Sequence, residues 1–356
     1  MKRLIASYSA QPEESRGRLF PEAESPPRSV FERDRDRVIH SSAFRRLKHK
    51  TQVFVYHEGD HYRTRLTHSI EVAQIARSVS RVLGLDEDLT EALALAHDLG
   101  HTPFGHAGER ELDKLMQPFG GFDHNAQSLR IVTKLEKKYA NFDGLNLTWE
   151  TLEGLVKHNG PLIDLHGHGV GHFKDRGLPQ AVIEYNEAHD LHLTSYPSAE
   201  AQVAAIADDI AYNAHDIDDG LRAKLFDIID LGDIPLVGEA LSNVLKLYPG
   251  LERSRIVHET VRRVISGMVA DVTAETRRNC SEAKVNSSQA VRSQARAMAQ
   301  FSAQMSENNR VLQNFLSTRM YRHARVLEIM ERAQRVVRDL FEAYMGDENL
   351  LPKGWR

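Results

Sequence analysis

The chain has 356 residues, of which 41% are apolar, and its net charge of −4 corresponds to a pI near 6.5. A chain of this length can bury roughly 75% of the surface that it exposes when unfolded, so it holds one large domain or two closely joined ones. The slightly acidic balance is not that of a dedicated nucleic-acid binder, although it leaves room for a local basic patch.

The single cysteine, Cys280, excludes an internal disulfide framework and suits a reducing compartment. No apolar run approaches the roughly 18 residues of a membrane span, and the start of the chain lacks a signal-peptide apolar region. We therefore expect a cytoplasmic protein without a membrane partner. Nine of the 18 histidines lie between residues 40 and 124, which suggests metal or phosphate chemistry.

Residues 1–28 carry several prolines and no hydrophobic period, which predicts an irregular N-terminal arm. From Ser29 to Leu47, charges of both signs at helical spacing accompany an apolar stripe, and we expect one helix. Its Arg45 either faces solvent or contacts a ligand phosphate. Residues 51–56 are the one stretch that favours a short strand.

The next two helices are predicted over 66–83 and 89–96. In a projection at about 100° per residue, His68 shares its face with four apolar residues, the last of which is Val82. His68 therefore points inward, either as a core histidine or as a ligand. The second helix is small and apolar throughout and ends at the pair His97–Asp98.

Three further helices are predicted over 108–116, 126–139 and 149–158. The stretch 160–178 is rich in glycine and histidine and has no period. It favours a mobile lid or surface loop over a second metal site, because it offers no cysteine or carboxylate on a rigid element.

A long helix over 198–222 is apolar on one side. Its other side carries polar residues within about 40° of one another, namely Asp208, Tyr212, His215 and Asp219. That pattern is typical of a solvated face or of the wall of a cleft.

The rest of the chain is predicted to be helical over 256–272 and 311–344, with a Ser/Gln/Arg-rich connection over 286–297 between them. Its apolar positions are typical of packing between helices, and the candidate ligand contacts are Arg319, Tyr321, Arg322 and His323. We expect an all-α fold with little or no β structure, divided into the arm, a core over 29–225 and a helical region over 226–356.

The densest chemistry lies between residues 97 and 109, where five groups that bind metal or move protons fall within thirteen residues: His97, Asp98, His101, His106 and Glu109. His106 and Glu109 are three residues apart, so they can meet on one helical turn as an acid–base pair.

Two imidazoles and two carboxylates would make a mixed nitrogen and oxygen site for a divalent metal: His68, His97, Asp98 and either Asp208 or Asp209. Without thiolates, the site suits Mn²⁺ or Mg²⁺, with Fe²⁺, Zn²⁺ or Co²⁺ as alternatives. Such an ion lowers the pKa of bound water to about 7 and polarises a phosphoryl oxygen, as hydrolysis of a phosphate ester requires.

Four motifs follow one another along the chain, over 35–53, 65–69, 97–106 and 207–216. Their order and content resemble the deoxyguanosine triphosphate triphosphohydrolase-like subfamily of the HD-domain metal phosphohydrolases, over about 29–345. The resemblance implies a helical HD core with a C-terminal helical extension. It also implies an enzyme that cleaves a deoxynucleoside triphosphate (dNTP) between the 5′ oxygen and the α-phosphorus, releasing deoxynucleoside and inorganic triphosphate.

The resemblance also implies roles for individual residues. The metal ligands are His68, His97, Asp98 and Asp208. The sugar and nucleoside contacts are Tyr212, Asp216 and Gln52. The phosphate contacts are Arg65, His101 and His124, and the catalytic residues are His101 and the proton-transfer pair His106 and Glu109.

One position departs from the family pattern. Some relatives carry a basic, phosphate-binding residue where this chain has Asp209, so we expect Lys157 or Arg45 to supply the missing cation. Relatives also assemble as oligomers with nucleotide effectors between subunits, which implies a homo-oligomer and a dNTP effector here.

Two other functions stay open at this stage. An HD nucleotidase or phosphodiesterase would act on monophosphates or on single-stranded DNA ends. A nucleotide- or nucleic-acid-binding regulator with little turnover would use the Arg-rich segments 28–50 and 253–263.

Overall fold

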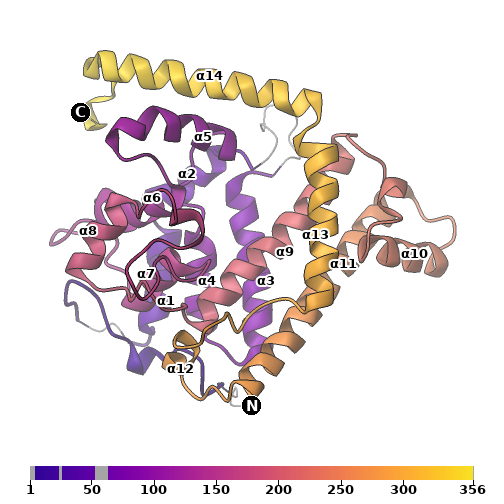
Figure 1. Cartoon of the computed structure of the whole chain (residues 1–356), viewed down its shortest axis with the longest axis horizontal. Coiled ribbons are helices and arrows are strands. Elements are labelled where there is room, and N and C mark those ends of the chain that lie inside the picture. Colours follow the sequence, from indigo (N-terminus) through magenta and orange to yellow (C-terminus); the bar gives the residue numbers. More distant parts are fainter. Residues whose placement is uncertain (1–4, 24–25, 53–62, 356) are drawn as a thin grey trace.

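The computed structural model describes residues 5–23, 26–52 and 63–355, and it contains fourteen α-helices (Figure 1). Within these ranges there is no strand, and the only extended pairings are four isolated β-bridges. The prediction of an all-α fold is confirmed.

The centre of the molecule is α4 (Glu87–Ala96), which is buried along nearly its whole length. Its second half, from Ala92 to Ala96, is small and apolar and has no face to offer to water. The acidic residues of its first half pair with Arg35 and Arg77. The helix packs against α1 (Val30–Ile39), α3 (Arg65–Leu83), α7 (Trp149–Lys157) and α9 (Ala199–Arg222). Figure 1 shows α3 and α9 side by side through the middle of the molecule.

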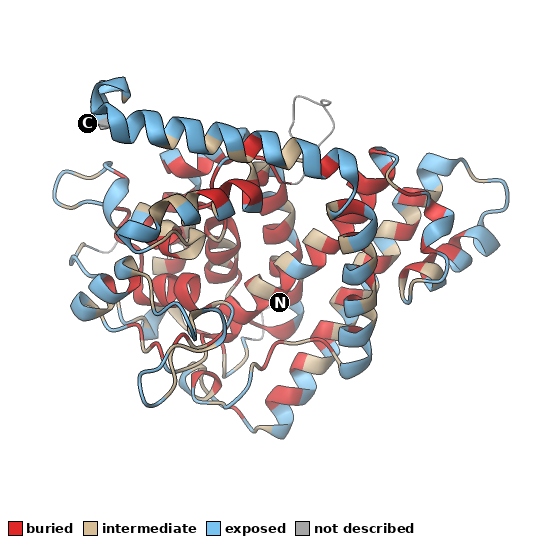
Figure 2. Cartoon of the chain, turned by 45° about the horizontal axis from the view of Figure 1, so that its top comes forward, coloured by how far each residue is buried: buried red, intermediate tan, exposed pale blue. Residues whose placement is uncertain are grey.

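The other helices surround this centre: α2 (Ser42–Arg46), α5 (Gly105–Met116), α6 (His124–Arg130), α8 (Gln180–Ala188), α10 (Val237–Leu247), α11 (Arg253–Glu282), α12 (Ser288–Arg292), α13 (Ala303–Leu316) and α14 (Ala324–Gly346). α6 packs against α7 and α8, and both α11 and α13 pack against α9. α14 lies across α5, where Arg338 forms an ion pair of 2.6 Å with Glu111, and Figure 2 shows it exposed along most of its length.

The N-terminal arm is irregular, with one short 3₁₀ turn over Pro12–Glu14, but it is tied to the core. The carboxylate of Glu200, at the start of α9, accepts hydrogen bonds from Ser9 Oγ at 2.8 Å and from Ala10 N at 2.9 Å. Farther along the arm, Arg18 forms an ion pair of 2.5 Å with the buried Asp34. Specific contacts therefore replace regular structure.

Several predicted helices are divided or shorter in the structure. The helix expected over 29–47 is split: α1 ends at Ile39, and Ser41 caps the start of α2 by accepting from Phe44 N at 3.0 Å. The helix expected over 126–139 ends in a π-helical turn at Leu135. There the backbone pairs instead with residues 144 and 145.

The helix expected over 311–344 is two helices. A π-helical turn over Ser317–Tyr321 ends the first, and His323 caps the second. This break lets α14 turn away and cover α5. The helices α8, α10 and α12 were not predicted, and Val82 is 50% exposed rather than inward. The predicted strand over 51–56 lies mostly outside the described residues.

Glu153 on α7 holds two cations inside the protein. Its carboxylate lies 3.2 Å from Lys157 Nζ and 3.0 Å from Arg292 Nε, and neither Glu153 nor Lys157 is exposed to solvent. Lys157 Nζ also donates to the His192 carbonyl at 2.9 Å. These contacts join α7 to α12.

Glu153→Ala would leave two buried cations without a counter-ion, and we expect the free energy of unfolding to fall by about 3–5 kcal/mol. Denaturant unfolding followed by circular dichroism measures this change. Glu307→Ala is the control, because its ion pair with Arg310 is exposed and should contribute little to stability. Equal losses in the two variants would contradict the assignment.

Asp86 caps α4 by accepting from Leu89 N at 2.8 Å, and burial together with the nearby Glu200 raises its pKa to about 7. The folded state thus binds this proton more tightly than the unfolded state, so its stabilising effect is lost as the pH rises from about 4 to 7. Asp86→Asn keeps the cap without ionising. Its stability relative to the natural chain should increase by about 1 kcal/mol or more between pH 5 and pH 8. Parallel pH profiles of the unfolding free energy would contradict this expectation.

Candidate functional site

Four predicted ligands meet where α3, α4 and α9 pack together, and we call them the His–Asp cluster: His68, His97, Asp98 and Asp208. His68 lies in the first turn of α3, His97 and Asp98 follow the last turn of α4, and Asp208 lies within α9. His68 Nε2 is 2.8 Å from Asp208 Oδ1 and 3.9 Å from Asp98 Oδ2. His97 Nε2 is 3.3 Å from Asp98 Oδ1 and 3.6 Å from Asp208 Oδ1.

The donor atoms of this cluster are set up for an ion. His97 Nδ1 lies 2.7 Å from the Ala94 carbonyl, which can only accept, so Nδ1 carries a proton, and in the neutral ring that binds a metal Nε2 keeps its lone pair. His97 Nε2 and Asp98 Oδ2 are buried, and neither has a hydrogen-bond partner. The His68 and His97 rings are inclined by 65°, so both lone pairs can point at one ion. The cluster can therefore hold a divalent metal.

Electrostatics keep both carboxylates of the cluster charged. Burial alone would raise the pKa of Asp98, but the guanidinium of Arg65, 2.8 Å away, and the nearby His97 hold it well below its usual range. Burial opposes ionisation of Asp208 as well, and His97 and His68 lower its pKa to about 2. The Asp208 side chain is 38% exposed, so the cluster opens to solvent beside it.

A second group lies next to the first, and we call it the Glu–His cluster: His101, His106, Glu109 and His124. Glu109 Oε2 is 3.1 Å from His106 Nδ1, and Glu109 Oε1 is 2.6 Å from His124 Nδ1. Burial would raise the pKa of Glu109, but its hydrogen bonds with both histidines lower it strongly. His101 Nε2 lies 3.3 Å from Asp98 Oδ1, so the two clusters touch.

The Glu–His cluster suits proton transfer better than metal binding, although three of its members lie close enough to share an ion. The rings of His101 and His124 stack at 4.0 Å with planes only 20° apart. A lone pair lies in the plane of its ring, so one ion cannot sit in both planes. Because the Glu109 carboxylate accepts Nδ1–H from His106 and His124, their Nε2 atoms are left free to accept or donate a proton.

A third group of predicted residues lies farther along α9, where Asp216 follows Tyr212 by one turn. Tyr321 Oη lies 2.5 Å from Tyr212 Oη and also donates a hydrogen bond to the Asp216 carboxylate. Burial, together with the neighbouring Asp219, raises the pKa of Asp216 to about 8. Of the two carboxylate oxygens, Oδ1 is buried without a partner.

Sequence reasoning gave Tyr321 only as one of four candidate contacts, because its π-helical turn is far from α9 in the chain. Gln52, the other predicted nucleoside contact, is buried at 7% exposure with its Oε1 unpartnered.

The structure does not bring the two proposed compensating cations to the His–Asp cluster. Lys157 is held by Glu153 and the His192 carbonyl, and burial lowers its pKa. Arg45 is directed to the His40 carbonyl on the exposed side of α2. The sequence suggested both because it shows neither burial nor pairing. Arg65 is the cation that the structure places beside the cluster.

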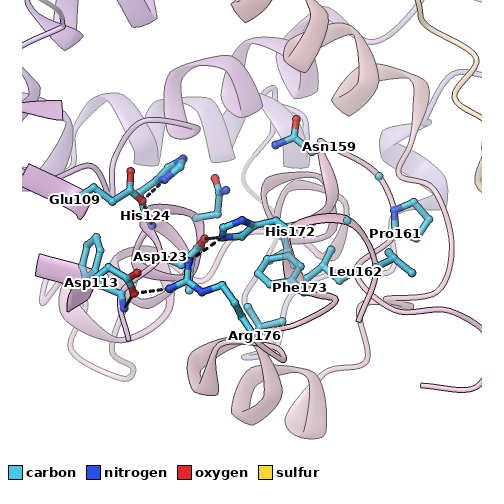
Figure 3. A pocket seen from close by; sticks show the side chains of 18 of the residues that line it. Glu109, Asp113, Asp123, His124, Asn159, Pro161, Leu162, His172, Phe173 and Arg176 are labelled. Carbon is cyan, nitrogen blue, oxygen red and sulfur yellow. Dashed lines mark hydrogen bonds and ion pairs between the residues drawn. The ribbon is translucent and has the colours of Figure 1, made fainter. Parts of the chain in front are cut away.

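A cavity of about 470 Å³ opens beside the Glu–His cluster, and Figure 3 shows it between Glu109 and His124 on one side and Pro161 and Leu162 on the other. The predicted loop over 160–178 covers it. Arg176 of this loop forms an ion pair of 2.5 Å with Asp113. His166 and His168 are not among the residues that line the cavity, and the described part of that loop forms no metal group.

Comparisons with known proteins agree with this geometry. Residues 65–213 match the HD domain, and residues 299–356 match the phosphohydrolase-associated domain. A deoxyguanosinetriphosphate triphosphohydrolase-like protein of Parvibaculum lavamentivorans is 61% identical over 99% of this chain and 87% of its own length. Its counterpart in Rhizobium meliloti is 58% identical over 97% of this chain and 84% of its own length.

The helical fold, the HD match and the His–Asp cluster together define an HD-type phosphohydrolase. Within that class, the chain belongs to the deoxyguanosinetriphosphate triphosphohydrolase-like family. None of the described helices has the length and apolarity needed to cross a bilayer.

Replacing a donor atom of the His–Asp cluster should abolish metal binding. We expect His97→Ala and Asp98→Asn each to weaken Mn²⁺ binding by at least about 100-fold, since even outer-shell changes cost 10–100-fold. Equilibrium dialysis with elemental analysis measures the bound ion. His168→Ala serves as the control, because that side chain is 79% exposed on the loop. Unchanged Mn²⁺ binding in His97→Ala would refute the assignment.

Proposed function

We propose that the protein hydrolyses dNTPs, dGTP among them, to deoxynucleoside and inorganic triphosphate with the help of a divalent metal. The observation that carries the proposal is the contact between the two clusters, because a candidate metal centre and a proton-transfer group then share Asp98. The names of the two relatives, which refer to deoxyguanosine triphosphate, support dNTPs as the substrate class.

In this proposal His68, His97, Asp98 and Asp208 hold the metal. The two carboxylates suit Mn²⁺ or Mg²⁺, our first candidates, and the two imidazoles also suit the alternatives Fe²⁺, Zn²⁺ or Co²⁺. When bound, the ion polarises the α-phosphoryl group and lowers the pKa of a water molecule. Arg65 balances negative charge at the α-phosphate from a buried position. His101 and His124 contact the phosphates from the adjacent wall.

The proton transfers fall to His106 and Glu109. His106 is 55% exposed, so its free Nε2 can reach a substrate oxygen, while its Nδ1 stays hydrogen-bonded to the Glu109 carboxylate. A carboxylate behind an imidazole fixes its tautomer and stabilises the protonated ring. His106 can thus give a proton to the departing 5′ oxygen of the nucleoside.

The sugar is assigned to Tyr212, Asp216 and Gln52. Tyr212 under the deoxyribose would disfavour a 2′-hydroxyl, and the unpartnered oxygen of Asp216 would accept the hydrogen bond of the 3′-hydroxyl. We also propose a homo-oligomer with a dNTP effector, as the family resemblance implies.

A product analysis tests the function. The purified protein is incubated with Mn²⁺ and each dNTP, singly and in pairs so that an effector is supplied. We expect deoxynucleoside and triphosphate in equal amounts, and a fall in kcat of about 10²–10⁴-fold in His106→Ala.

Release of monophosphate with pyrophosphate would refute the proposed bond cleavage. Turnover only of monophosphates or of single-stranded DNA ends would establish the nucleotidase or nuclease alternative. Salt-sensitive binding of DNA without turnover would indicate a regulator instead.

A further inference from the structure

A chain of polar contacts extends from His68 away from the His–Asp cluster. His68 Nδ1 lies 3.1 Å from His215 Nδ1, and His215 Nε2 lies 2.6 Å from Glu71 Oε2. Glu71 in turn accepts a hydrogen bond of 3.0 Å from Arg63 Nε. Glu71 shares α3 with His68, whereas His215 belongs to α9, so this series of contacts crosses between the two helices.

Glu71, at the end of this series of contacts, determines which ring nitrogens of His215 and His68 carry protons. Burial opposes ionisation of Glu71, but the hydrogen bond from His215 and the charge of Arg63 lower its pKa to about 2. An ionised carboxylate only accepts, so His215 Nε2 carries a proton. In neutral His215 the Nδ1 atom is then an acceptor, and it takes the Nδ1–H of His68. With its proton on Nδ1, His68 can present the Nε2 lone pair to an ion bound together with Asp208, whose Oδ1 lies 2.8 Å away.

We propose that His215 and Glu71 are positioning residues that hold His68 in the tautomer and orientation that bind the metal. The proposal rests on the metal-dependent function proposed above, and adds to it two residues that contact neither the substrate nor the metal. Metal-ligating histidines usually donate their second ring N–H to such a partner, and its loss typically costs 10–100-fold in metal affinity.

Burial and ion pairs fix the positions of His68, His215 and Glu71. His215 and His68 are 5% and 1% exposed, so water does not replace either partner freely. Arg63 anchors the more exposed Glu71 and is itself held by Asp218 Oδ2 at 2.9 Å and Asp219 Oδ1 at 3.0 Å. A purely structural link between α3 and α9 would not need a particular proton direction, and this difference can be tested.

The test measures Mn²⁺ affinity of the metal-free full-length chain at fixed pH by isothermal titration calorimetry, without nucleotide. His215→Leu removes the acceptor for His68 Nδ1–H, and we expect the Kd for Mn²⁺ to rise 10–100-fold. Glu71→Gln can present an N–H to His215 and reverse the proton order, so a comparable rise is expected.

His215→Gln should restore binding to within about threefold of the natural chain, because an amide can donate to Glu71 and accept from His68 with one side chain. Asp218→Asn is the matched control. It weakens a contact of Arg63 but leaves the hydrogen bonds that join His68, His215 and Glu71 intact, so the Kd of this variant for Mn²⁺ should not change. Circular dichroism confirms folding of each variant.

Folded His215→Leu with an unchanged Kd overturns the proposal. So does equal weakening in His215→Leu and His215→Gln, which would indicate packing rather than proton direction. If the variants show the predicted order of Mn²⁺ affinities but the natural chain does not hydrolyse dNTPs, the proposed function is refuted. The positioning role of His215 and Glu71 is then still supported.

Discussion

The buried negative charge of Asp98 constrains the arrangement of the other residues in the His–Asp cluster. Its carboxylate is 2% exposed at the end of α4, and burying an unpaired charge costs several kcal/mol. Arg65 pairs with it from α3, and His97 and His101 lie within 3.3 Å of the same oxygen. The helices that carry these side chains must therefore keep their spacing for the charge to be tolerated.

The same charge balance favours an anionic ligand. Without an ion, the carboxylates of Asp98 and Asp208 face the guanidinium of Arg65, and Lys50 also lies near enough to interact with Asp98. A divalent ion would neutralise both carboxylates and leave the positive charge of Arg65 in excess, in a place where few water molecules screen it. An anion would then be attracted more strongly to the metal-loaded centre. This accounts for a cluster that opens to solvent on the side of Asp208 and is closed on the side of Arg65.

Features that depend on the residues of a single helix could be predicted from the sequence. The spacing of apolar residues showed that His68 faces inward, and the small apolar run before His97 showed that α4 is buried. The sequence could not show contacts that depend on how helices meet. The relay from His68 to His215 and Glu71 crosses from α3 to α9, and Tyr321 reaches Tyr212 only because a π-helical turn ends α13. Lys157 was misplaced for a related reason: its ion-pair partner Glu153 also binds Arg292 of α12, and its carbonyl acceptor, His192, is 35 residues away in the chain. The burial of this lysine therefore depends on contacts between elements that one helix does not show.

The position of His124 in the Glu–His cluster depends on a residue with no side chain. A Cβ at Gly100 would lie 2.0 Å from the His124 carbonyl and 2.3 Å from Ser128 N, so α6 reaches the end of α4 only because Gly100 is bare. The Gly100 N–H donates to Ser128 Oγ at 2.8 Å, and Ser128 Oγ donates to the His97 carbonyl at 3.2 Å.

These bonds fix the turn that carries Asp98 and His101 against the start of α6. His124 is the first residue of that helix, which is why its ring stacks on His101 and its Nδ1 reaches Glu109. A larger residue at position 100 would push α6 outward. It would move His124 away from His101 and Glu109 while leaving every ligand of the His–Asp cluster in place.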